Sequence, residues 1–146
     1  MSDYDEQNAR IQAVFNLDEI PRVKEKHLEH YLKWLKGQLT LPCLLTGIES
    51  IGYFDWEERY EFGYGSPTEY EKTKKKRGSY QENYELKTLD KTKIGGVWNS
   101  DILASVVRVS DKKQFTIPLS ELQAVDESSE NYQLLNDYTV WYVNWR

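Results

Sequence analysis

The chain has 146 residues, which suits one domain with a real core, and its formal net charge is −5. This acidic balance disfavours nucleic acid as a partner and is compatible with cations or a basic protein surface. Hydrophobic residues make up 39% of the chain and aromatic residues 14%, so we expect a small fold stabilised by large Tyr and Trp side chains.

Nothing in the sequence indicates disulfide bonds, secretion or a membrane. Cys43 is the only cysteine, which rules out an internal disulfide bond. Residues 1–10 are acidic and polar, unlike a signal peptide. The longest apolar stretches are far shorter than the roughly 20 residues of a membrane span. We therefore expect a cytoplasmic protein without a membrane partner.

The first periodic segment predicts an amphipathic helix at about residues 21–36. Its apolar side chains recur at helical spacing: Leu28, Tyr31, Leu32, Leu35 and Leu39. Pro21 suits the first helical position, and Gly37 suits the residue just past the end. Residues 1–20 are predicted to be partly disordered.

Two histidines lie three residues apart on this predicted helix. The spacing of His27 and His30 would place two imidazoles beside one metal ion. No cysteine or third histidine completes a zinc set. The favoured interpretation is that His27 borders the apolar stripe and His30 is solvated.

Short runs typical of strands follow Pro42. Residues 43–46 and 48–54 are the first two runs. Residues 102–109 and 114–117, joined by the turn-like 110–113, predict a hairpin. We expect a tight helical turn at 118–122, a helix or turn near 133–137, and a final strand at 138–145.

These elements predict the α+β class. The N-terminal amphipathic helix is expected to pack on a small antiparallel sheet or a partly closed SH3-like barrel. Neither an internal repeat nor a linker divides the chain, so residues 1–146 are predicted to form a single domain, sheet-rich after the helix.

Residues 53–71 mix carboxylates and aromatic rings more densely than a core or a loop requires, and are expected to form a surface loop or strand edge. Ca²⁺ takes six to eight oxygens from carboxylates, carbonyls and water in forgiving geometry. The densest group of candidate ligands consists of Asp55, Glu57, Glu58 and Glu61, and the alternative is a plain solvated acidic face. Asp126, Glu127 and Glu130 form a second acidic patch.

The same stretch also suits a protein-interaction module. Trp56 and Tyr60 would then form a hot spot whose acidic rim steers a basic partner, for instance in a regulatory or toxin-neutralising complex. Catalysis is disfavoured, because neighbouring carboxylates on a solvated segment do not raise one another's pKa as an acid and base pair requires, and no catalytic motif is present. The basic residues within 72–77 predict a solvated loop rather than a nucleic-acid contact.

Three blocks carry a family resemblance. They are YLKWLKGQLTLP (31–42), DWEERYEFGYGSPTEYE (55–71) and the segment 106–146, which contains IPLSEL and ends in DYTVWYVNWR. They resemble the bacterial calcium-binding protein family whose namesake is the cyanobacterial protein CcbP. The resemblance implies a small α+β domain with a barrel-like sheet that binds Ca²⁺ through acidic surface groups. Together with the carboxylates of 55–61, it predicts a non-enzymatic domain that binds Ca²⁺ weakly.

Overall fold

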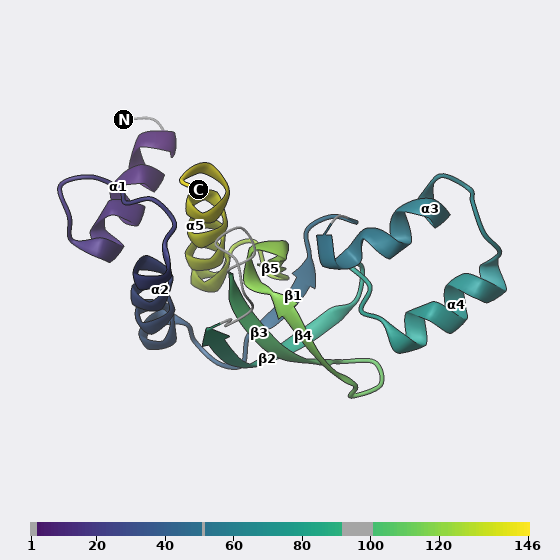
Figure 1. The fold of residues 1–146 in the computed structure, drawn as a ribbon. Helices are drawn as coiled ribbons and strands as arrows, with labels where there is room; N and C mark the ends of the chain where they lie inside the picture. Colours follow the sequence, from purple (N-terminus) through teal and green to yellow (C-terminus); the bar gives the residue numbers. More distant parts are fainter. Residues whose placement is uncertain (1–2, 51, 92–100) are drawn as a thin grey trace.

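The computed structural model describes residues 3–50, 52–91 and 101–146. Helices and strands alternate irregularly along the chain (Figure 1). In chain order they are α1 (Asp3–Phe15), α2 (Glu25–Gln38), β1 (Leu44–Gly47), the 3-10 helix η1 (Gly52–Glu57), α3 (Glu58–Glu61), α4 (Pro67–Lys76), β2 (Asn83–Lys91), β3 (Ile102–Arg108), β4 (Gln114–Pro118), the 3-10 helix η3 (Leu119–Glu121), β5 (Leu122–Ala124) and α5 (Glu130–Asn144). No helix in these described ranges combines the length and the apolar character that crossing a bilayer requires.

The strands form one five-stranded antiparallel sheet in the order β4-β3-β2-β1-β5. The predicted hairpin is confirmed, because β3 pairs with β4 in a register that places Ala104 opposite Ile117. The predicted tight turn is confirmed as η3. The α+β class is therefore correct. The linear strand order matches the sheet alternative, and the SH3-like barrel is not confirmed.

The core lies where α1, α2 and α5 gather beside the sheet (Figure 1). Leucines are its most numerous residues, whereas its largest fully buried side chains are aromatic rings. Tyr31, Tyr138 and Trp141 are fully buried, and the Tyr31 ring lies 5.1 Å from each of the other two rings. Alternate residues of β3 face this core, since Ile102 and Ala104 are buried while the residue between them is only partly so. Aromatic packing thus joins α2 to α5.

The amphipathic helix exists but begins later than predicted. Instead of 21–36 it spans Glu25–Gln38, so Pro21 lies outside it and Gly37 lies inside it. Residues 20–24 are not helical, and contacts with the C-terminal helix α5 and the residue after it hold them in place. The Pro21 carbonyl accepts a hydrogen bond from Trp141 Nε1 at 2.8 Å, and the backbone N–H of Val23 donates to the carbonyl of Trp145 at 2.8 Å.

Within the segment predicted to be partly disordered, the structure places Asp3–Phe15 in helix α1. Three side chains of this helix, Ile11, Val14 and Phe15, are buried. Arg10 also donates two hydrogen bonds to the buried carboxylate of Asp137 on α5, at 2.8 and 3.0 Å. Apolar burial and this ion pair stabilise α1, although the first ten residues of the chain are mostly polar.

The predicted strand at 138–145 is wrong, because these residues belong to helix α5 apart from the last. Ser129 caps this helix, and its Oγ accepts a hydrogen bond from the backbone N–H of Tyr132 at 3.1 Å. The buried residues of α5 recur at helical spacing: Leu134, Leu135, Asp137, Tyr138, Trp141 and Tyr142. Burial of this face overrides the strand preference of the individual residues.

The strand predicted at 48–54 is also wrong, since the described residues of that range lead into η1 at Gly52. Most of residues 53–71, expected as a surface loop or strand edge, instead lie in η1, α3 and the start of α4, and 62–66 connect the last two. Ser66 caps α4 by accepting a hydrogen bond from the N–H of Glu69 at 3.1 Å, and Pro67 occupies its first turn. The basic residues 72–76 continue α4 rather than forming a loop. Figure 1 shows α3 and α4 beyond the sheet, opposite α1 and α2.

Candidate functional site

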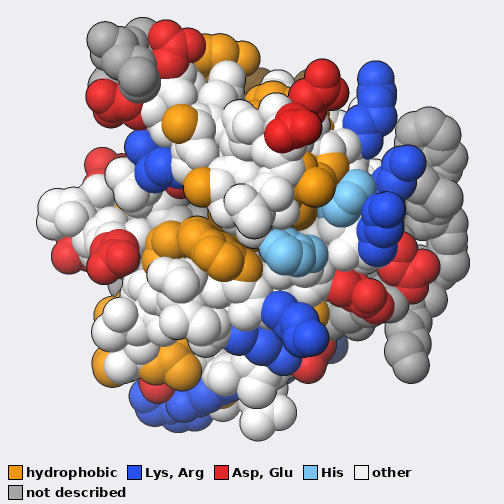
Figure 2. Space-filling model, turned by 90° about the vertical axis from the view of Figure 1, so that its left-hand side faces the viewer, with side chains coloured by type: hydrophobic (Ala, Val, Ile, Leu, Met, Phe, Trp, Pro, Cys, Tyr) orange, Lys and Arg blue, Asp and Glu red, His pale blue; other side chains and the backbone are white. Residues whose placement is uncertain are grey.

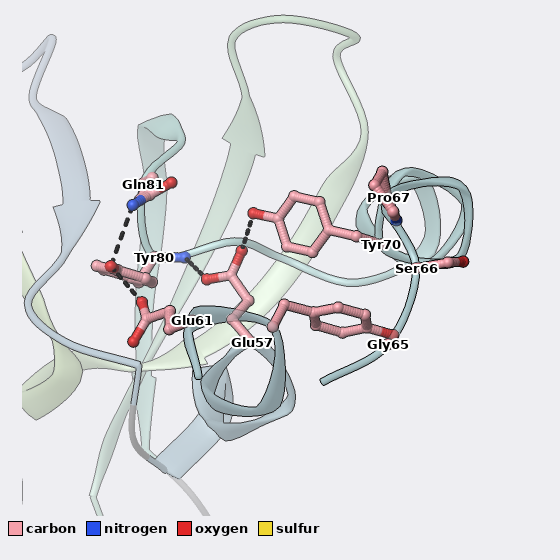
Figure 3. A pocket seen from close by; sticks show the side chains of 9 residues that line it. Glu57, Glu61, Gly65, Ser66, Pro67, Tyr70, Tyr80 and Gln81 are labelled. Atoms are coloured by element: carbon pink, nitrogen blue, oxygen red, sulfur yellow. Dashed lines mark hydrogen bonds between the residues drawn. The ribbon is translucent and has the colours of Figure 1, made fainter. Parts of the chain in front are cut away.

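A pocket of about 330 Å³ opens between α3, the start of α4 and the residues just before β2. Figure 3 shows the side chains around it, with Glu57 and Glu61 facing Tyr70 and Tyr80. The lining residues are Glu57, Tyr60, Glu61, Gly65, Ser66, Pro67, Tyr70, Tyr80 and Gln81. Among these described residues two are acidic and none is basic.

Glu57 is the buried carboxylate of the pocket, with 1% of its surface exposed. Its Oε1 accepts a hydrogen bond from the Tyr70 hydroxyl at 2.9 Å, and its Oε2 accepts one from the backbone N–H of Tyr80 at 3.1 Å. A buried charge without such donors would be costly. The two donors fix the orientation of this carboxylate.

Glu61 lies one helical turn further on and is exposed. Its Oε1 accepts a short hydrogen bond from the Tyr80 hydroxyl, and its Oε2 accepts one from Ser50 Oγ at 2.9 Å. Tyr80 therefore binds both carboxylates, Glu57 through its backbone and Glu61 through its hydroxyl. Each of the four carboxylate oxygens has one protein donor and keeps further acceptor capacity.

Both phenols are held in the protonated form. Burial, followed by the hydrogen bond to Glu57, raises the pKa of Tyr70 to about 12. The hydrogen bond to Glu61, followed by burial, raises the pKa of Tyr80 above its ordinary value. At neutral pH both hydroxyls therefore donate to the carboxylates.

Packed rings form the wall of the pocket. Trp56 is only 8% exposed, donates from Nε1 to the Gly78 carbonyl at 2.9 Å, and stacks on Tyr70 with centroids 5.7 Å apart. Tyr60 meets Tyr70 edge-on at 5.1 Å. Gly65 has φ +87°, and a Cβ there would lie 2.6 Å from Tyr60 Cε1. A larger residue at this position would displace the Tyr60 ring.

Of the predicted partner-binding residues, Tyr60 is half-buried and lines the pocket, whereas Trp56 is buried, lies outside the lining and stacks on Tyr70. Of the four predicted metal ligands, the structure brings Glu57 and Glu61 together at the pocket, whereas Asp55 and Glu58 are exposed and lie outside its lining.

The donor set suits Ca²⁺ only in part. No three acidic, histidine or cysteine side chains in the described ranges form a group that would hold a metal ion. Two carboxylates supply at most four oxygens, whereas Ca²⁺ takes six to eight and accepts water for the rest. The pair therefore fits a partly hydrated Ca²⁺ ion and does not fit a closed coordination shell.

The other sequence candidates have structural partners. Figure 2 shows both histidines on the face that carries α2, and one ring nitrogen of each contacts a backbone carbonyl. His27 Nδ1 lies 2.9 Å from the carbonyl oxygen of Arg22, and His30 Nε2 lies 2.7 Å from that of Val14. In the second acidic patch, hydrogen bonds from the Ser128 hydroxyl and N–H lower the pKa of Asp126.

Residues far along the chain hold the helices of the pocket. Arg108, 2% exposed, donates from its guanidinium to the carbonyls of Lys74, Lys75 and Arg77 at the end of α4. Both carboxylate oxygens of Glu121 accept from the N–H of Tyr53 in η1, at 3.2 and 3.1 Å. These two contacts anchor the two ends of the segment that carries the site.

Sequence reasoning missed Tyr80 and Gln81. Their role depends on the return of the chain from α4 into β2, which no local pattern encodes. The start of α4 did carry a signal, because Ser66 followed by Pro67 is a typical helix N-terminus.

A protein-family model described as calcium binding, named after CcbP, matches residues 57–142. The solved structure of a "Calcium binding protein in the calcium-binding form" aligns with a TM-score of 0.54 at 14% sequence identity, over 98% of this chain and 96% of that chain. At this identity the structural likeness shows a shared fold. No curated protein matches the chain. The family match begins at Glu57 and covers more than half of the sequence, and so the chain belongs to the CcbP-type calcium-binding family.

Proposed function

We propose that this chain binds Ca²⁺ weakly through Glu57 and Glu61 and that it acts in the cytoplasm without catalysing a reaction. One observation carries the proposal: a member of a calcium-binding family has two carboxylates facing a single pocket whose described lining includes no basic residue. The negative potential of such a pocket favours a cation.

Weak binding follows from the ligands. The carboxylate oxygens already accept hydrogen bonds from Tyr70, Tyr80 and Ser50, so an entering ion must share or displace these donors. Glu61 is exposed, and water completes the coordination there. We expect a dissociation constant in the micromolar to millimolar range, about 10⁻⁵ to 10⁻³ M. Asp55 and Glu58 contribute only long-range attraction.

An NMR titration with Ca²⁺, with Mg²⁺ as control, tests this proposal. We expect saturable shifts at Glu57, Glu61 and Tyr80, and weaker effects from Mg²⁺, which demands stricter geometry and gives up its water reluctantly. The Glu61→Gln substitution should weaken Ca²⁺ binding about fivefold or more, because it removes a ligand charge.

The matched control is Glu58→Gln, which removes an exposed carboxylate from the same short helix but from outside the pocket. Its Ca²⁺ affinity should stay within about twofold of the wild type. Flat spectra up to several millimolar Ca²⁺, or equal weakening by the two substitutions, would refute the assignment.

A protein-interaction function is the second candidate, and exposed rings favour it. Phe62 is 70% exposed and Tyr64 is 68% exposed, immediately after α3. With Trp56 buried, these two rings and Tyr60 are the available anchors for a basic protein partner. Partner binding should be lost in the Phe62→Ala/Tyr64→Ala double variant while Ca²⁺ titration is unchanged. Binding that persists without both rings would argue against this surface.

A further inference from the structure

We propose that the pocket between α3, α4 and Tyr80 binds an alkylammonium group, a protonated amine on an aliphatic chain. This ligand is distinct from Ca²⁺, and the inference does not depend on the calcium proposal.

The charge of the pocket is uncompensated. Within the described residues no Lys or Arg forms an ion pair with Glu57 or Glu61. The nearby basic side chains have other partners: Arg59 lies 3.7 Å from Glu69, and Lys74 lies 3.4 Å from Glu82. Two carboxylates therefore face the pocket with hydrogen-bond donors but without a counter-charge.

The shape and the walls suit an organic cation. A volume of about 330 Å³ lies in the range of small-molecule pockets, which begin near 300 Å³. Tyr60, Tyr70 and Pro67 supply apolar surface that an aliphatic chain would cover. A bare metal ion would leave this surface in contact with water.

The carboxylates match an ammonium head group. An ammonium has three N–H donors and no acceptor, and the four carboxylate oxygens each retain acceptor capacity beyond their single protein donor. Charge-assisted hydrogen bonds to Glu57 gain strength because that carboxylate is buried. The Tyr hydroxyls fix the carboxylates in place, so little reorganisation accompanies binding.

The same rings already attract cations of this chain. The Arg59 guanidinium carbon lies 5.3 Å from the Tyr60 ring centroid, and the Lys74 ammonium lies 5.8 Å from that of Tyr70. These are cation–π distances. A ligand cation in the pocket would lie beside the same two rings.

Two sources share this chemistry: a free diamine or polyamine, and a lysine side chain of a basic protein. Titrations followed by NMR would use n-butylammonium, 1,4-diaminobutane and N-acetyl-lysine methylamide, with n-butanol as the uncharged control. We expect saturable shifts at Glu61, Tyr70 and Tyr80 with each amine and none with butanol. Tighter binding of the diamine identifies free amines as the source, and equal or tighter binding of the lysine derivative identifies a protein side chain.

Substitutions make the assignment specific. Glu61→Gln, at an exposed position, should weaken butylammonium binding about tenfold, whereas Glu58→Gln should leave it unchanged. Tyr60→Leu should weaken it through the lost ring, with an unchanged one-dimensional spectrum showing that the fold is retained. Three results would overturn the proposal: equal binding of butanol, equal effects of the two Gln variants, or no shift at about 50 mM amine. At that concentration even a dissociation constant of about 30 mM gives a detectable shift. Added Ca²⁺ should compete if both cations use Glu61. Amine binding without calcium binding would refute only the calcium proposal.

Discussion

Replacing Arg108 by Met should destabilise the protein by about 3 kcal/mol, because its guanidinium ties the end of α4 to the β3–β4 hairpin. It donates to Lys74 O at 2.7 Å, Lys75 O at 3.1 Å and Arg77 O at 3.2 Å, and twice to the Asp111 carboxylate. Hydrogen bonds of a charged group contribute about 1.5–3 kcal/mol each. These energies are not additive, and in the Arg108→Met variant water can donate hydrogen bonds to the helix carbonyls. The loss of unfolding free energy is therefore well below the sum of the single contributions.

Urea unfolding followed by circular dichroism measures this loss. With an m-value of about 2 kcal/mol/M, the midpoint should fall by about 1.5 M. Arg59→Met is the matched control, since Arg59 is exposed and its nearest ion-pair contact is 3.7 Å long. It should cost less than about 0.5 kcal/mol. If Arg108→Met stayed within about 1 kcal/mol of the wild type, or if the two variants were equal, the capping role would be wrong.

Four further substitutions test the structure. Gly52→Ala should cost about 1–3 kcal/mol, because Gly52 has φ +57° and a Cβ there would lie 1.5 Å from Glu121 Oε1. Gly37→Ala, inside α2 with nothing within 4 Å, should instead stabilise by about 0.5–1 kcal/mol, and thermal unfolding that failed to separate the two would contradict the geometry. Arg108 lowers the pKa of Asp111 from 3.8 to about 2. The ion pair between these residues therefore stabilises the fold above pH 3.8, and this stabilisation is lost as the pH falls towards 2. Asp111→Asn should remove that part of the acid sensitivity, and parallel curves of unfolding free energy against pH for the two proteins would refute it. Arg10→Ala should cost about 1–2 kcal/mol of unfolding free energy, since Arg10 joins α1 to Asp137. It should also speed amide hydrogen exchange in α1 more than in β3. An equal increase of the exchange rate in both elements would exclude a local effect.

The fold was predictable where local chemistry and tertiary packing agree. The β-branched residues of β3 and the turn before Gln114 specify the hairpin, and Pro118 ends its second strand. The C-terminal residues show the opposite case. Tyr138, Val140 and Trp141 individually favour strands, but a capped helix buries Tyr138 and Trp141 against α2. Residue preference is worth a fraction of a kcal/mol, whereas burying such rings is worth several.

The candidate site was predictable only in part. Carboxylate density identified Glu57 and Glu61, and their separation of four residues places them on one side of a helical segment. It also included Asp55 and Glu58, because the stretch was expected to be a loop or strand edge rather than a helix. Tyr80 was not predictable, since its contacts with both carboxylates arise from the path of the chain after α4.

The capping of α4 by Arg108 has a consequence for the order of folding. A synthetic peptide covering residues 50–82 would contain every described residue that lines the pocket, yet it would lack Arg108 and Glu121, which anchor the two ends of that segment. Such contacts span more than 30 residues of sequence, and closing so long a loop costs entropy before the contacts stabilise anything. The pocket should therefore appear late on the folding pathway, and in stopped-flow refolding the Trp56 environment should become native after the hairpin does.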